Sequence, residues 1–238
     1  MKIKILYEDS NILAIDKPSG ILSHPDKFSK EETILDWAAK KFKKAELVHR
    51  LDKDTSGAMI IAKNNKAHEF LKSQFVNREI KKTYVAIVSG SVKNDRGVIN
   101  KPIGRSPKDF RRHLAGRGAR GEMREAITEY KVLKRLTLPL APSLIRAGVA
   151  SPDKGRTEGL FSFLEVRPKT GRTHQIRVHM KYLNHPVACD SLYNPGGPCP
   201  TGISRLALHA RSIEFKDLKG KTIKVESPLP KEFEKVIK

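Results

Sequence analysis

The sequence predicts an α+β fold with a mixed, largely antiparallel central sheet flanked by helices and loops. Short apolar runs of strand character and amphipathic helical stretches follow one another without strict alternation, which argues against a purely parallel sheet. The 238 residues, 38% of them hydrophobic, are enough to bury one core. We therefore expect a single domain over residues 1–238.

The first strand is predicted at 11–16, where NILAID is largely apolar. It ends in the turn from Lys17 to Gly20, in which proline fixes φ and glycine permits a positive φ. A helix is predicted from about Thr33, because apolar residues recur there at helical spacing and lysines follow at its C-terminal end.

Buried strand character returns at 57–62, and 66–76 predicts a helix with an apolar face, capped by Asn64 or Asn65. Apolar runs predict further strands at 83–88, 160–166, 205–209, 211–215 and 222–226. Helical spacing predicts two more helices, one from Thr173 and a short one after Pro230.

The charge of the chain indicates the class of its partner. Lys and Arg number 47 against 26 acidic residues, a net charge of +21, which predicts attraction to a polyanion, with nucleic acid ahead of an anionic membrane. No apolar run approaches the roughly 18–20 residues needed to span a bilayer, and no secretory signal is recognisable. We therefore expect no membrane association.

Two cysteines, Cys189 and Cys199, are too few for a disulfide framework or a four-cysteine zinc site. A reduced cytoplasmic location is expected from this usage.

Two segments lack periodicity. Residues 101–124 contain eight basic and two acidic residues, a net charge of +6, and we expect a mobile basic loop that binds RNA. Its contacts are expected from Arg105, Arg111, Arg112 and Arg117. The segment 137–159 is irregular and is expected to be an insertion.

Three segments carry residues suited to chemistry. In HRLDKDTSG, at 49–57, an acid, bases and hydroxyls precede an apolar strand, although Asp52 or Asp54 in such a turn often serves only as a cap. The segment KTYVA, at 82–86, contains Tyr84, and an isolated tyrosine in a strand usually serves packing.

The third segment, RPKTGRTHQIRVHM at 167–180, combines several basic residues with two histidines. It is suited to binding phosphate or holding a carboxylate ionised, or it is a solvated, basic helix start. A zinc site is not expected, because His174 and His179 are five residues apart with no Glu between them.

Together these segments resemble a known family. HRLDKDTSG followed by MIIAK is similar to the catalytic motif of the RluA-type pseudouridine synthases, KTYVAIVSG to the motif that carries their tyrosine, and GRTHQIRVHM to the motif with their basic residue. RLALHA at 205–210 and the stretch 6–25 also match, so the resemblance covers nearly the whole chain in order. It implies a stand-alone catalytic domain, with no room for the N-terminal RNA-binding domain of many relatives.

The resemblance implies a role for each matched residue. Asp52 is the catalytic carboxylate, Tyr84 stacks on the target uracil, and Arg177 salt-bridges the Asp. Arg50 matches the residue that in relatives fills the gap left by a flipped base. One departure is Cys189, which stands where relatives usually have Gly before an Asp.

The implied activity is isomerisation of uridine in structured ribosomal or transfer RNA, without a cofactor or metal. Arg172 and His174 are expected to contact RNA, with shaping of its loop as the other role expected for Arg172. No obligate protein partner is expected for what we take to be a monomer. Two alternatives remain: a non-catalytic RNA-binding or ribosome-assembly protein, and a carboxylate-based glycosidase, which lacks an obvious second acid.

Overall fold

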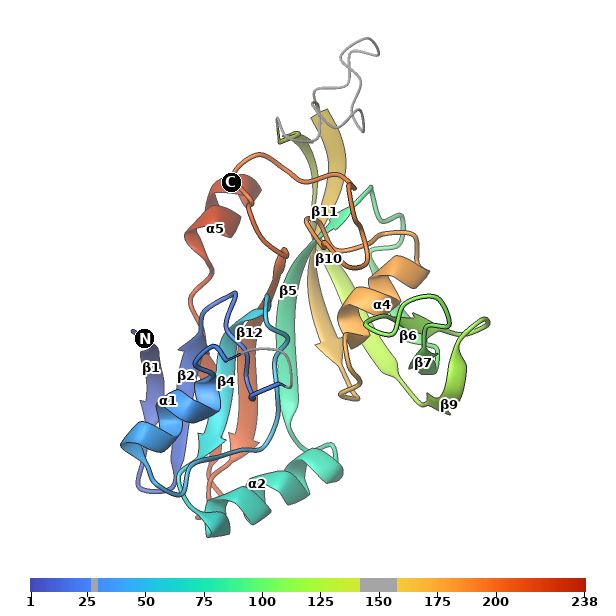
Figure 1. The fold of residues 1–238 in the computed structure, drawn as a ribbon. Helices are drawn as coiled ribbons and strands as arrows, with labels where there is room; N and C mark the ends of the chain where they lie inside the picture. The colour runs from blue at the N-terminus through green and yellow to red at the C-terminus, as the bar shows by residue number, and fades with distance from the viewer. Residues whose placement is uncertain (27–29, 142–157) are drawn as a thin grey trace. The chain divides into compact units, whose positions relative to one another are not determined.

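The computed structural model describes residues 1–26, 30–141 and 158–238 (Figure 1). The chain divides into two compact units. The first unit comprises Met1–Thr83 and His209–Pro228, and the second comprises Tyr84–Leu208 and Leu229–Lys238.

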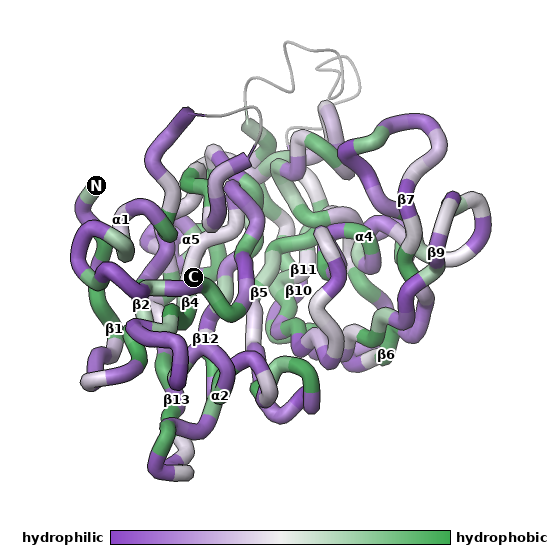
Figure 2. The backbone as a smooth tube through the Cα atoms, turned by 60° about the horizontal axis from the view of Figure 1, so that its bottom comes forward, coloured by the Kyte–Doolittle hydropathy of each residue, from purple (hydrophilic) through white to green (hydrophobic). Residues whose placement is uncertain are grey.

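The first unit is built on a mixed sheet of strands β1 (Lys4–Glu8), β2 (Ile12–Lys17), β4 (Ser56–Ala62) and β12 (Leu208–Lys216), in that order. The β4–β12 pair is parallel and the others are antiparallel. Off this path, β13 (Thr222–Glu226) pairs with β12 and β3 (Glu46–Leu47) pairs with β4, both antiparallel. Every residue of β4 is buried, and most of the strand is hydrophobic, as the colour scale of Figure 2 indicates.

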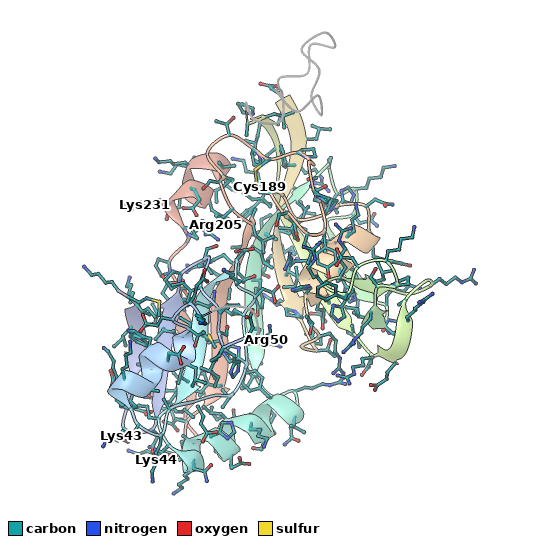
Figure 3. All side chains as sticks on the ribbon, in the orientation of Figure 1. Lys43, Lys44, Arg50, Cys189, Arg205 and Lys231 are labelled. Atoms are coloured by element: carbon teal, nitrogen blue, oxygen red, sulfur yellow. A yellow bond between two sulfur atoms is a disulfide. The ribbon has the colours of Figure 1, made fainter. Side chains whose placement is uncertain are left out.

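The described part of this unit has two helices. Helix α1 (Ile34–Lys41) begins at Thr33, which forms a capping box with Asp36, and buries Trp37. Lys43 and Lys44 project from the chain just after it (Figure 3). Helix α2 (Asn65–Val76) is capped by the side chain of Asn64, which accepts from the backbone N–H of the third residue beyond it.

The second unit is built on an antiparallel sheet in the order β5 (Lys81–Ser89), β11 (Glu158–Pro168), β10 (Ile127–Pro139) and β6 (Arg96–Asn100). Among the described residues of this unit, the helices are α4 (Gln175–Tyr182) and α5 (Lys231–Ile237). A separate small sheet has the order β8 (His113–Ala115), β7 (Ile103–Arg105) and β9 (Arg120–Arg124).

The predicted α+β class with a mixed, largely antiparallel sheet is confirmed, and so are the four predicted helices. The two strands expected at 205–209 and 211–215 are one strand, β12, so that prediction is wrong. Strand β10 was not predicted, because only Thr128 and Leu136 are buried on it and its sequence shows little apolar alternation.

The prediction of an irregular loop at 101–124 is also wrong, since the three short strands of the small sheet lie there. The insertion expected at 137–159 lies largely outside the described residues, and its two ends belong to β10 and β11. The single catalytic domain stays a prediction.

Candidate active site

Asp52 lies half-buried in the turn between β3 and β4 of the first unit. The turn is stabilised by Lys17, which is fully buried at the end of β2. The Lys17 Nζ donates hydrogen bonds to the carbonyls of Lys53 and Thr55, each at 2.9 Å. A buried ammonium thus finds two of its acceptors in the main chain that follows Asp52, and a third in the carbonyl of Pro18 at 3.0 Å.

Two serines fix the same turn. Ser23 Oγ donates to the carbonyl of Leu51 at 2.8 Å and accepts from its N–H at 3.2 Å, and Ser19 Oγ donates to the carbonyl of Asp54 at 2.7 Å. The backbone is therefore fixed on both sides of Asp52 by groups from the preceding segment.

His49 anchors the start of the turn. Its Nε2 accepts from the N–H of Ile60 at 3.0 Å, and its ring stacks on Phe75 with centroids 5.0 Å apart. Burial, with a smaller contribution from the charge of Lys82, lowers the pKa of His49 to about 3. The ring is therefore neutral with its proton on Nδ1, and the first residue of the HRLD run has a structural role that sequence reasoning missed.

Gly57 closes the motif at the parallel contact between β4 and β12. Its φ is +115°, and a Cβ there would lie 2.2 Å from the carbonyl oxygen of Ala210. Only glycine fits so close to a neighbouring backbone.

In the second unit, Arg177 lies on α4 and is only 5% exposed. Its Nε and Nη2 donate to the two carboxylate oxygens of Asp190 at 2.7 and 2.8 Å, and its guanidinium stacks over Tyr193 at 5.1 Å. Asp190 Oδ1 also accepts from the N–H groups of Leu192 and Tyr193, each at 2.9 Å. The pairing of Arg177 with Asp52 stays a prediction.

The N-terminal end of α4 is held by side chains. Gln175 accepts from Thr170 Oγ1 and from the N–H of Arg172 and donates to two groups of β10, so all its hydrogen-bonding atoms are used. Arg172 Nε donates to the carbonyl of Glu125 at 2.8 Å, which supports a loop-shaping role. His174 has a φ of +54° and its Nδ1 lies 3.0 Å from the hydroxyl of Tyr193.

Tyr84 lies on β5 opposite Val166 and is half-buried, with its ring partly packed against the core of the second unit. A half-buried ring is compatible with both expected roles, stacking on a base and packing.

The basic segment 101–124 is hydrophilic along most of its course in Figure 2. Arg111 makes two hydrogen bonds to Asp109, at 3.0 and 2.9 Å, and Arg112 lies 3.4 Å from the same carboxylate, which lowers the pKa of Asp109 to about 2. Arg105 and Arg117 are exposed and form no ion pair with another described residue. In the first unit, Arg50 is likewise exposed.

Cys189 and Cys199 form a disulfide, with Cα atoms 5.0 Å apart, a bond that the sequence did not predict (Figure 3). Cys189 has a φ of +58°, in the left-handed region that favours glycine. Glycine adopts this conformation at lower energetic cost than any other residue. Sequence reasoning missed the bond because ten residues separate the two cysteines and spacing alone does not show that they meet.

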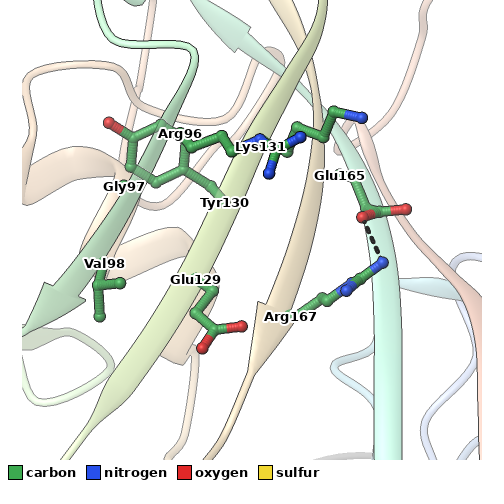
Figure 4. Close-up of a pocket in the computed structure, with 8 residues that line it drawn as sticks. All are labelled: Arg96, Gly97, Val98, Glu129, Tyr130, Lys131, Glu165 and Arg167. Atoms are coloured by element: carbon green, nitrogen blue, oxygen red, sulfur yellow. Dashed lines mark ion pairs between the residues drawn. The ribbon is translucent and has the colours of Figure 1, made fainter.

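A shallow pocket of about 590 Å³ lies on the second unit's sheet (Figure 4). Arg167 and Glu165, which both line it, form an ion pair of 2.9 Å. None of the predicted site residues lines it; its lining residues are Arg96, Gly97, Val98, Glu129, Tyr130, Lys131, Glu165 and Arg167. The pocket therefore contributes nothing to the candidate site.

Among the residues that the structure describes, no group of three or more His, Cys, Asp and Glu side chains is arranged to hold a metal ion. In the same part of the chain, no helix has both the length and the apolar character needed to cross a membrane.

Comparison with known proteins gives one consistent result. Residues 11–182 match the family model described as RNA pseudouridylate synthase. A Bacillus subtilis (strain 168) protein named as an uncharacterized RNA pseudouridine synthase is 36% identical over 236 residues, covering 96% of this chain and 69% of its own length. The ribosomal large subunit pseudouridine synthase D of Borreliella burgdorferi is 36% identical over 242 residues, covering 97% of this chain and 66% of its own.

Solved structures agree on the fold. Human RNA pseudouridylate synthase domain containing 1 has a TM-score of 0.75 at 24% identity, covering 96% of this chain and 84% of its own. Human RNA pseudouridylate synthase domain containing 4 has a TM-score of 0.70 at 25% identity, covering 97% and 90%.

Proposed function

Because the chain belongs to the RNA pseudouridylate synthase family and is an isomerase that acts on RNA, we propose that it converts uridine to pseudouridine in structured ribosomal or transfer RNA, with Asp52 as its catalytic carboxylate. The observation that carries the proposal is the fixed turn around Asp52. Its carbonyls are bound by Lys17, Ser19 and Ser23, so a half-buried carboxylate is presented on a rigid main chain.

The reaction needs a carboxylate but no redox step. The N1–C1′ bond breaks, the uracil turns, a C5–C1′ bond forms, the C5 proton leaves and N1 gains a proton. An ionised Asp52 either attacks the sugar covalently or assists the loss of a proton and stabilises a cationic sugar. The atoms balance in both routes without a cofactor.

Three further residues take roles in this proposal. Arg177, whose guanidinium is oriented by Asp190, is assigned to keep the carboxylate ionised. Tyr84 is assigned to stack on the uracil and to assist proton removal. Arg50, which is exposed, is assigned to occupy the space left by the flipped nucleotide.

Asp52→Asn tests the proposal directly. The variant keeps the size and much of the hydrogen bonding of the side chain but loses the charge and the nucleophilic oxygen. It is expected to fold, to bind RNA about as tightly as the wild type and to form no pseudouridine. Asp54→Asn, two residues away in the same turn, is the matched control and is expected to keep substantial activity. A folded, active Asp52→Asn enzyme would contradict the mechanism.

A second pair of variants separates the roles of Tyr84. Tyr84→Phe keeps the ring, so RNA affinity is expected to hold while turnover falls if the hydroxyl takes part in proton removal. Tyr84→Ala is expected to lose on the order of 1–3 kcal/mol of RNA binding. Full activity in both variants would identify Tyr84 as a packing residue.

The RNA target is best found by mapping pseudouridines across total RNA from cells with and without the gene. We also propose a monomer without an obligate protein partner, which light scattering of the purified protein tests. The proposed compartment is the cytoplasm. Thiol trapping of Cys189 and Cys199 in cells tests this placement, because a reducing compartment is expected to open most disulfides.

A further inference from the structure

Phe110 is the most exposed large hydrophobic side chain in the described part of the chain, at 82%. A single exposed apolar residue is ordinary on a protein surface. This one, however, lies between β7 and β8, and four basic residues of the +6 segment surround it in sequence: Arg105, Lys108, Arg111 and Arg112.

The turn that carries Phe110 is internally hydrogen-bonded. The N–H of Arg112 donates to the carbonyl of Asp109, and the N–H of Ser106 donates to the carbonyl of Arg112, both at 2.9 Å. The N–H of Arg111 donates to Asp109 Oδ1 at 3.0 Å. The ring is therefore held out on a closed turn, which reduces the ordering cost of a contact made there.

The base of this hairpin is anchored in the second unit. Ile103 belongs to a small buried cluster with Val178 of α4 and Tyr193, and the N–H of His113 donates to the hydroxyl of Tyr193 at 2.9 Å. The apolar residue at the base is buried while the one at the tip is exposed. A packing role accounts for Ile103 but leaves Phe110 unexplained.

We propose that Phe110 stacks on an unpaired base of the RNA substrate while the surrounding cations bind the adjoining phosphates. An aromatic face beside positive charges is the combination that binds single-stranded nucleotides without reading their sequence. The inference rests on the proposed RNA substrate and restricts its class. The RNA bound at the β7–β8 hairpin of the protein has a loop, bulge or end rather than a continuous duplex.

Phe110→Ala tests the stacking through affinity for a synthetic RNA hairpin and for a fully paired duplex of similar length. Affinity for the hairpin is expected to fall about 5- to 150-fold, from 1–3 kcal/mol per stacked base. Affinity for the duplex is expected to change little. Phe110→Tyr is expected to restore binding and Phe110→Leu is not, because only the former keeps an aromatic face.

The salt dependence distinguishes the ring from its neighbours. Phe110→Ala removes no charge, so the slope of log affinity against log salt is expected to stay unchanged, whereas Arg105→Ala is expected to reduce it by about 0.7–0.9. Val98→Ala, which changes another exposed apolar residue of the same unit at 65% exposure, is the control and is expected to bind like the wild type.

Phe110→Trp provides a direct optical test. The chain has one tryptophan, Trp37, which is 7% exposed in α1, so the wild type gives the background. RNA is expected to quench the added fluorescence in the variant and to leave the wild type nearly unchanged. Absence of quenching, or wild-type affinity in Phe110→Ala, would overturn the inference even if pseudouridine forms. Quenching without product would support it and count against the proposed function instead.

Discussion

The buried ion pair between Arg177 and Asp190 gives a sharp prediction about stability. The side chains are 6% and 0% exposed, and the carboxylate also accepts two backbone N–H groups. Asp190→Asn removes the negative charge and turns one hydrogen-bond acceptor towards Arg177 into a donor. Breaking a buried pair in this way costs about 3–5 kcal/mol, which lowers Tm by roughly 6–20 °C for a chain of this size.

Thermal and urea unfolding measure this loss, with a surface pair as the matched control. Arg135 and Asp95 form an equally short contact of 2.6 Å, but their side chains are 40% and 77% exposed. Asp95→Asn is therefore expected to cost no more than about 1 kcal/mol. If Asp190→Asn cost no more than Asp95→Asn, the pair would not contribute what its burial implies.

A double variant separates the charge from the packing. Arg177→Gln together with Asp190→Asn places two neutral, hydrogen-bonding side chains at the site and removes the uncompensated cation. It is expected to be more stable than Asp190→Asn alone while pseudouridine formation stays lost, because Arg177 is proposed to act in the reaction. If the double variant lost as much stability as Arg177→Gln and Asp190→Asn lose together when measured separately, the reasoning from charge would be refuted.

Three other predictions follow from local geometry. The pKa of His49 is lowered from 6.5 to about 3, so on acidification the unfolded chain binds a proton at this residue before the folded chain does. The free energy of unfolding is therefore expected to fall as the pH drops from about 6.5 towards 3, by at most about 1.4 kcal/mol per pH unit. His49→Gln is expected to flatten this dependence when unfolding is measured against pH. Gly57→Ala is expected to cost about 2–5 kcal/mol in urea unfolding, because its Cβ meets backbone, while Gly220→Ala, with a φ of +80° and open space, should cost about 1 kcal/mol. Cys199→Ser is expected to cost roughly 2.5–3 kcal/mol from the loop of ten-residue separation, and a melt unchanged by the substitution would show that the bond does not form.

Local signals account for what the sequence predicted well. Helices α1 and α2 were predicted because their caps, Thr33 and Asn64, and their apolar spacing lie within a few residues of each other. Strand β10 could not be predicted in this way. Only two of its residues are buried, and it is a strand because it pairs with β11 on one side and β6 on the other.

In the candidate site, too, features set by local sequence differ from features set by tertiary contacts. Asp52, Tyr84 and Arg177 were identified only through the family resemblance, since each residue alone has a commoner structural explanation. Arg177 and Asp190 are thirteen residues apart in sequence, and their contact depends on how α4 packs against the loop that follows it. Sequence spacing alone does not predict a contact across such a loop.

The segment 49–57 that carries Asp52 is longer than the proposed chemistry requires, and the structure gives a physical reason. His49 accepts a hydrogen bond from β4, Leu51 is bound through its backbone to Ser23, and Gly57 lets β12 approach. These residues fix the main chain and need not touch substrate. Within the motif, conservative changes at His49 or Gly57 should therefore lower stability and activity together, whereas Asp52→Asn should remove activity from a protein that still folds.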